Sequence, residues 1–187
     1  MNYSINPELA VSGQAARQAE LRNGIGLGTH YIIEARDPQG NLKWVDEFDN
    51  LVTTAGLNVS LTQTFVAASA VPDWHVGVTT GSPVFSASDT MAGHAGWTES
   101  ALYSESLLQT LTLGSVAGGT VNNTGAKAVF TINADATPIG GAFVTTASAK
   151  GATTGTLYGG GAFVAGTKTL DNLDTLSILV TLTATAA

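Results

Sequence analysis

The chain contains no cysteine, and this absence excludes three kinds of chemistry together. Disulfide scaffolds, thiolate zinc sites and cysteine nucleophiles all need a thiol, and none of the 187 residues supplies one. The stability of the fold must therefore come from packing and from hydrogen-bonded pairing.

Charge is scarce, and positive charge is the scarcest. Only 11% of the residues are charged, against roughly 25% in an average soluble domain. The seven Lys and Arg residues are never adjacent, and the net charge is −7. A nucleic-acid groove needs clustered basic residues to displace counterions, so we expect no direct contact with DNA or RNA. Low charge also suits a surface that neighbouring subunits partly cover.

Long apolar runs and catalytic fingerprints are missing too. No window approaches the 18 apolar residues of a membrane span, and residues 1–23 lack the basic start and apolar run of a signal peptide. No G-x-S-x-G elbow, P-loop or dinucleotide-binding motif is present. We therefore expect neither membrane insertion, nor an enzyme, nor a bound cofactor.

What is present is a β-rich pattern. The length suits one ordinary domain, in which 44% of the residues are hydrophobic and 22 are glycine. From about residue 107 onward, apolar segments of strand length alternate with turn clusters. The final segment alternates, with Leu176, Ile178, Val180 and Leu182 on one face. This spacing predicts a mainly β fold, an antiparallel sandwich or a jelly-roll-like barrel.

Two earlier segments have clear local signals. Residues 29–48 predict a hairpin, because partially alternating segments flank the turn formers of residues 37–41. Residues 53–66 carry Leu57, Leu61 and Phe65 at helical spacing, with Thr53 or Thr54 as the N-cap. We expect one short helix here, packed on a sheet.

Residues 1–27 differ from the rest and predict an N-terminal arm or marginal helix, followed by a single β-rich domain over residues 28–187. A helix would begin near Asn6-Pro7 and end at Asn23-Gly24, but its apolar stripe of Leu9, Ala16 and Leu21 is thin. The glycine-rich residues 24–28 are interpreted as a flexible lead-in to the first strand.

The pentapeptide GGAFV occurs twice, at residues 140–144 and 160–164. This offset fits two core strands joined by a turn, with Phe143 and Phe163 at matching positions. Glycine before each phenylalanine would let two backbones approach closely.

The segment from Trp74 to Glu99 is the natural place to look for a site, because it holds two of the three tryptophans and two of the three histidines. Two interpretations stay open: packing under a long loop, or an aromatic anchor at a subunit contact. Asp89 is expected to cap the turn that follows it. The residues of this candidate assembly loop are Trp74, Asp89, His94, Trp97, Glu99 and Tyr103.

Two other functions can be built on the same segment. A metal-dependent hydrolase would use His75, His94 and Glu99, but their spacing matches no zinc pattern. We therefore expect no metal site. A carbohydrate-binding module would instead use Trp74, Trp97 or Tyr103 as an exposed stacking platform.

A set of motifs over about residues 29–184 resembles virion structural proteins of tailed bacteriophages, of the capsid decoration or cement type. The motifs are Gly40-Asn41 with Trp44, Asn50-Leu51-Val52, Trp74 with Val76-Gly77, Asp89-Thr90-Met91-Ala92 with His94 and Gly96 to Glu99, Phe130-Thr131-Ile132, Gly140 to Phe143, and Asp174-Thr175-Leu176. Residues 1–27 have no counterpart in this pattern.

The resemblance implies a structural role without catalysis. Such a protein would assemble as a homo-dimer or homo-trimer on the outside of the capsid and would bridge major capsid protein subunits. It would be made in the cytoplasm of the bacterial host. A tail or fibre component remains an alternative.

Overall fold

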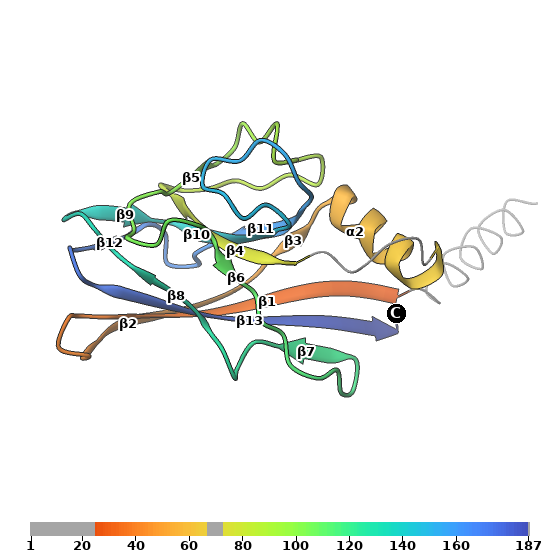
Figure 1. Cartoon of the computed structure of the whole chain (residues 1–187), viewed down its shortest axis with the longest axis horizontal. Coiled ribbons are helices and arrows are strands. Elements are labelled where there is room, and N and C mark those ends of the chain that lie inside the picture. The colour runs from red at the N-terminus through yellow and green to blue at the C-terminus, as the bar shows by residue number, and fades with distance from the viewer. Residues whose placement is uncertain (1–24, 67–72, 187) are drawn as a thin grey trace, which may run out of the picture.

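The computed structural model describes residues 25–66 and 73–186, and within them two antiparallel sheets pack face to face (Figure 1). The sheets remain open at their edges and do not close into a barrel. The prediction of a mainly β sandwich with one short helix is confirmed. In these two ranges no helix is long and apolar enough to cross a membrane.

The first sheet is built on two long strands that pair along their whole length. β1 and β13 run antiparallel, from Ile25 opposite Ala186 to Arg36 opposite Thr175. The predicted alternation of the last strand is confirmed, because Leu176, Ile178 and Val180 are buried. The strands of this sheet are β1 (Ile25–Arg36), β2 (Leu42–Asp49), β7 (Thr120–Asn122), β8 (Ala128–Thr131) and β13 (Thr175–Ala186).

The predicted hairpin of residues 29–48 is confirmed as the antiparallel pair β1 and β2. The flexible lead-in at residues 24–28 is wrong from Ile25 onward, because β13 continues far enough to pair with every residue of β1. Residues 25–27 therefore belong to the β domain and not to the arm. Residues 1–24, where the rest of the arm was predicted, lie outside the described residues.

The second sheet lies above the first in Figure 1 and is assembled from shorter strands. Of the apolar segment at residues 107–116, only β6 forms strand. The strands of this sheet are β3 (Leu51–Val52), β4 (His75–Thr80), β5 (Thr98–Glu99), β6 (Gln109–Thr110), β10 (Gly141–Thr145) and β11 (Leu157–Ala162). β9 (Thr137–Ile139) and β12 (Lys168–Leu170) form a separate two-stranded ladder.

The two GGAFV copies pair with each other as β10 and the end of β11, which confirms that they form neighbouring core strands. Both phenylalanines are buried, but their positions do not match. Phe143 packs on Trp97 on the outer face of the second sheet, whereas Phe163 packs on Phe48 between the sheets. The copies differ because Phe143 pairs with Gly160 inside the ladder, while Phe163 follows the last residue of β11.

Helix α2 (Thr54–Leu61) continues into the π-helical turn η1 (Thr62–Val66), and Thr53 is its N-cap, accepting a hydrogen bond from the Gly56 N–H. The predicted helix is confirmed, but its predicted apolar stripe is not the buried face. Gly56 is the buried residue, since any added Cβ would overlap the Tyr158 carbonyl. Leu57, Leu61 and Phe65 are exposed. The close approach of helix and sheet needs glycine and turns the larger side chains away.

Candidate functional site

Residues 81–97 form a cover over the outer face of the second sheet, held by a stack of rings. The Trp97 ring lies 3.8 Å from His94, 5.1 Å from Phe85 and 4.9 Å from Phe143, measured between centroids. Trp97 is only 5% exposed as a result. Phe143 comes from β10, so the stack fastens the cover to the sheet below it.

Hydrogen bonds between polar groups of the cover also hold it in one conformation. The Asp89 Oδ2 atom accepts hydrogen bonds from the Trp97 indole N–H at 3.0 Å and the Ser86 N–H at 2.9 Å. His94 Nδ1 donates to the Trp97 carbonyl at 3.0 Å. The expectation that Asp89 caps the following turn is wrong, because its carboxylate is engaged by Trp97. The Thr90 hydroxyl performs that task by accepting from the Gly93 N–H at 3.0 Å.

Glu99 and Tyr103 form a second group around Lys150. The Lys150 ammonium lies 3.6 Å from the Tyr103 ring centroid and donates to the Tyr103 carbonyl at 2.7 Å. Glu99 Oε2 accepts from the Gly151 N–H at 3.1 Å. Burial raises the pKa of the Glu99 carboxyl and of the Tyr103 hydroxyl. These residues join the β5 region to the loop at residues 149–151.

The structure therefore divides the six predicted site residues among three places. Asp89, His94 and Trp97 meet in the cover, and Glu99 and Tyr103 lie beside Lys150. Trp74 is remote from both and packs edge-on against Tyr158, with ring centroids 5.4 Å apart. Across residues 25–66 and 73–186, no three His, Asp or Glu side chains are grouped so that they could hold a metal ion.

The stacking platform of the carbohydrate hypothesis is buried. Trp97 is buried inside the ring stack that fastens the cover to the sheet. Tyr103 is 1% exposed, and its ring packs against Phe130. A sugar needs an accessible aromatic face, which neither ring offers. Trp74 is half-buried and retains only part of its surface.

Glu99→Gln is expected to stabilise the protein at neutral pH. Burial raises the folded-state pKa of Glu99, so the folded state binds its proton more tightly than the unfolded state does. Stability from this group is complete below the ordinary value of 4.5 and is lost as pH rises through the folded pKa. Glutamine keeps an oxygen for the Gly151 N–H but carries no charge. Thermal unfolding should show a higher Tm at pH 7 and no gain near pH 3.

Asp73→Asn is the control, because Asp73 is an exposed carboxylate outside the group around Lys150. It should leave the Tm at pH 7 as in the wild type. A Glu99→Gln protein that is less stable than wild type at pH 7 would contradict the predicted effect of burial.

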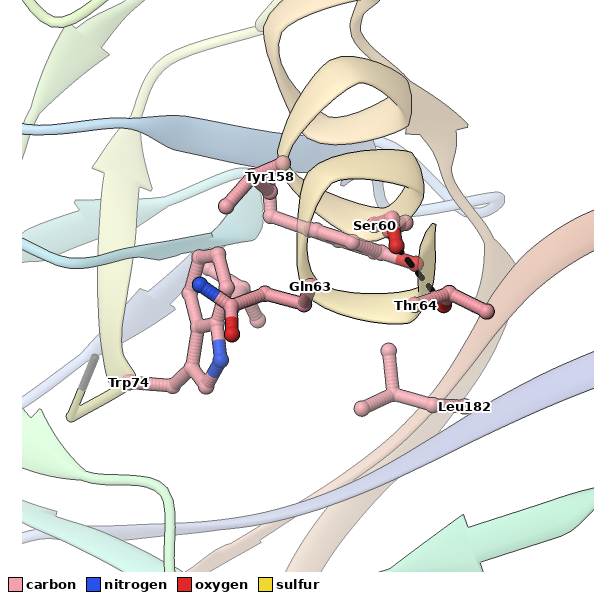
Figure 2. A pocket seen from close by; sticks show the side chains of 8 residues that line it. Ser60, Gln63, Thr64, Trp74, Tyr158 and Leu182 are labelled. Carbon is pink, nitrogen blue, oxygen red and sulfur yellow. Dashed lines mark hydrogen bonds between the residues drawn. The ribbon is translucent and has the colours of Figure 1, made fainter. Parts of the chain in front are cut away.

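A cleft that the sequence did not reveal opens beside helix α2 and η1, at one end of the sandwich. One cavity, of about 260 Å³, lies between the helix and the second sheet (Figure 2). Figure 2 shows the Trp74 and Tyr158 rings on one side and Leu182 of β13 on the other. Its lining residues are Val59, Ser60, Gln63, Thr64, Trp74, Val144, Tyr158 and Leu182.

A second cavity, of about 390 Å³, lies on the other flank of the same helix. Ser60 and Thr64 line both cavities, but their hydroxyls donate to helix carbonyls at 2.9 and 2.8 Å. Among the described residues that line the two cavities, none is charged. The residues of the second cavity are Ile25, Leu27, Leu57, Ser60, Leu61, Thr64, Phe65 and Ala184. We call this second cavity the helix groove.

Comparisons of the chain with protein-family models, with curated proteins and with solved structures found no match.

Proposed function

We propose that this protein is a structural virion protein of the capsid decoration type, which acts without catalysis as a homo-oligomer and binds the major capsid protein on the outside of the head. The motif set that resembles such proteins is the starting point. The observation that supports it best concerns the Trp74–Glu99 segment, which holds two of the three tryptophans and two of the three histidines.

The side chains of the Trp74–Glu99 segment bond mainly to one another and to the sheet. The Asp89 carboxylate is occupied by Trp97 and Ser86, and the His94 ring is stacked on Trp97. A binding or catalytic site would aim such groups into a cavity. Here they fix a long connection in one shape, which suits a rigid surface for assembly.

The edge of β2 supports self-association. β2 is the edge strand of the first sheet. The Asn50 N–H donates to the Thr29 carbonyl of β1. Because hydrogen-bonded residues alternate along an antiparallel pair, the even-numbered residues of β2 bond to β1. The N–H groups of Val45 and Glu47 consequently point outward. Val45 is 46% exposed. An antiparallel copy centred on Val45 would bring Val45 of each copy opposite Val45 of the other.

Val45→Lys is expected to abolish self-association and to weaken attachment to the particle. In the proposed pairing two copies of residue 45 face each other, so two lysines would repel directly. Light scattering coupled to size exclusion should show a dimer for the wild type and a monomer for the variant. Cryo-EM of virions should show the sandwich on the head exterior, with paired copies joined edge to edge.

Val116→Lys is the control, because Val116 is highly exposed just before β7, on the other side of the first sheet from β2. It adds the same charge away from the β2 edge and should remain dimeric. A wild-type protein that is monomeric at every concentration would refute the β2 contact. Density on the tail, or a particle without this protein, would refute the decoration role.

A further inference from the structure

The cavity beside Trp74, which we call the Trp74 cavity, differs from the helix groove in how its walls are made. In the helix groove the large apolar side chains of the helix are exposed. In the Trp74 cavity two walls come from the second sheet, where Val144 and Tyr158 belong to β10 and β11, which pair with each other. Both side chains are buried. The cavity is therefore a concave space whose walls the fold already holds in place.

The inner end of this cavity is apolar and its rim is polar. Val144 and Tyr158 at the inner end are buried, while Trp74 and Leu182 are only partly buried against the core. Gln63 is half-buried and Thr64 beside it is exposed. A ligand in the cavity would consequently place its apolar atoms inward and a polar group toward η1.

The helix presents a mixed face to the cavity, and this face lies where the helix changes its winding. The residues of the face recur at helical spacing and are Val59, Ser60, Gln63 and Thr64. The α-helical part ends at Leu61, and the π-helical turn η1 begins at the next residue. Turns of this kind are rare and occur frequently at functional sites. The π-helical turn is thus a second observation, independent of the cavity, that points to a site here.

The lining also indicates the chemistry of a ligand. The Trp74 and Tyr158 rings meet edge-on, with centroids 5.4 Å apart and planes at 76°. A planar ring beside this pair can stack on one ring and meet the other with its edge, the two arrangements that aromatic groups prefer. None of the described lining residues is charged, so a charged ligand would lose its hydration without gaining an opposite charge.

The size of the cavity limits the ligand further. An apolar cavity of about 150 Å³ can hold benzene, and the Trp74 cavity has about 260 Å³. Sites for larger, drug-sized ligands usually start at about 300 Å³. The space therefore suits one ring or two fused rings.

We propose that the Trp74 cavity binds a small, uncharged aromatic molecule of one or two rings that carries a single hydrogen-bonding group. The ring would lie between the Trp74 and Leu182 sides of the cavity (Figure 2). Its polar group would meet the Gln63 amide at the rim. In Figure 2 a hydrogen bond joins Thr64 to Ser60, and none joins the Gln63 amide to another residue of the lining. The proposal is independent of the virion role, since it concerns the isolated chain.

Titration of the full chain with indole tests the proposal. Correlation NMR of nitrogen-labelled protein gives one indole N–H signal for each of the three tryptophans, and the signal missing from Trp74→Phe identifies Trp74. We expect this signal to shift and to saturate. The Trp97 indole is buried and bonded to Asp89, so its signal should stay in place. Indole-3-acetate, which adds a negative charge to the same ring, should bind at least about tenfold more weakly.

Val59→Phe puts a larger side chain into the cavity and should weaken indole binding at least about tenfold. The control is Val129→Phe, which makes the same exchange at an exposed position of β8 in the first sheet. It should bind indole as the wild type does. Gln63→Leu removes the amide at the rim and should weaken binding by about fivefold through the lost hydrogen bond.

A Trp74 signal that stays in place up to the solubility limit of indole would overturn the proposal. A shift that does not saturate, or equal affinities for indole and indole-3-acetate, would overturn it as well. Unchanged affinity in a folded Val59→Phe protein would place the ligand outside the cavity and refute the assignment. If Val59→Phe does not fold, Gln63→Leu decides, and an affinity equal to that of the wild type would then contradict the proposal.

Discussion

Phe143→Ala is expected to lower the free energy of unfolding by about 3–5 kcal/mol. The Phe143 side chain is fully buried, and its ring fills the space above Gly77 on the neighbouring strand, where an added Cβ would overlap it. The ring also supports Trp97, 4.9 Å away between centroids. Alanine would leave a cavity that the paired strands β4 and β10 cannot close. Urea denaturation followed by fluorescence measures the loss.

Phe163→Ala is the matched variant, because it removes the same side chain from the other face of the second sheet. Phe163 packs against Trp44 and Phe48, so a loss of about 3–5 kcal/mol is expected there as well. Val164→Ala, at the next and exposed position, should change stability by no more than about 0.5 kcal/mol. A loss below about 1 kcal/mol for either phenylalanine would show that its contacts do not carry the core.

The two phenylalanines differ in what they should do to the candidate loop. Phe143 is a member of the ring stack with Trp97, while Phe163 is not. Near-UV circular dichroism of the folded Phe143→Ala protein should therefore lose the contribution of Trp97, whereas Phe163→Ala, which removes a contact of Trp44, should keep it. Such a difference would tie the rigidity of the cover at residues 81–97 to the core of the second sheet.

Local signals in the sequence predicted most of the fold. The alternation in residues 175–186, the turn formers of residues 37–41 and the cap at Thr53 each act within a few residues, so their outcome depends little on the rest of the chain. The extent of β1 was underestimated, because Ile25 and its neighbours are strand only through their pairing with the end of β13. No local pattern carries that information.

The candidate site was predicted less well, because its geometry depends on distant partners. Helical spacing identified Leu57 and Leu61 as one stripe, but the buried side of the helix is decided by the close contact of Gly56 with Tyr158. Asp89 accepts a hydrogen bond from the Trp97 indole, and the position of that indole depends on its packing against Phe143. The cleft at Trp74 unites residues from five separate segments of the chain.

Gly140→Ala is expected to destabilise the protein by at least about 3 kcal/mol, although it adds a single methyl group to an uncharged turn. A Cβ at residue 140 would overlap the Gly81 carbonyl and crowd the Pro83 ring. Gly140 cannot shift away, because its N–H donates to Thr79 O at 2.9 Å and its carbonyl accepts from Phe163 N–H at 2.8 Å. The methyl group would thus separate β4 from β10 where the cover begins. Thermal and urea unfolding measure the effect.

Gly125→Ala provides the control for this effect, since no atom lies within 4 Å of the added Cβ at that position. It should be neutral, or stabilise by about 0.4–1 kcal/mol through the lower entropy of the unfolded chain. If Gly140→Ala matched Gly125→Ala, the first glycine of the GGAFV copy would not be required by packing. If Gly140→Ala destabilises the protein as expected, the close approach of the Gly81 carbonyl is what requires glycine at residue 140. At the matching position of the second copy, Gly160 makes room for the Phe85 ring. The two copies of GGAFV would then need glycine for two different contacts.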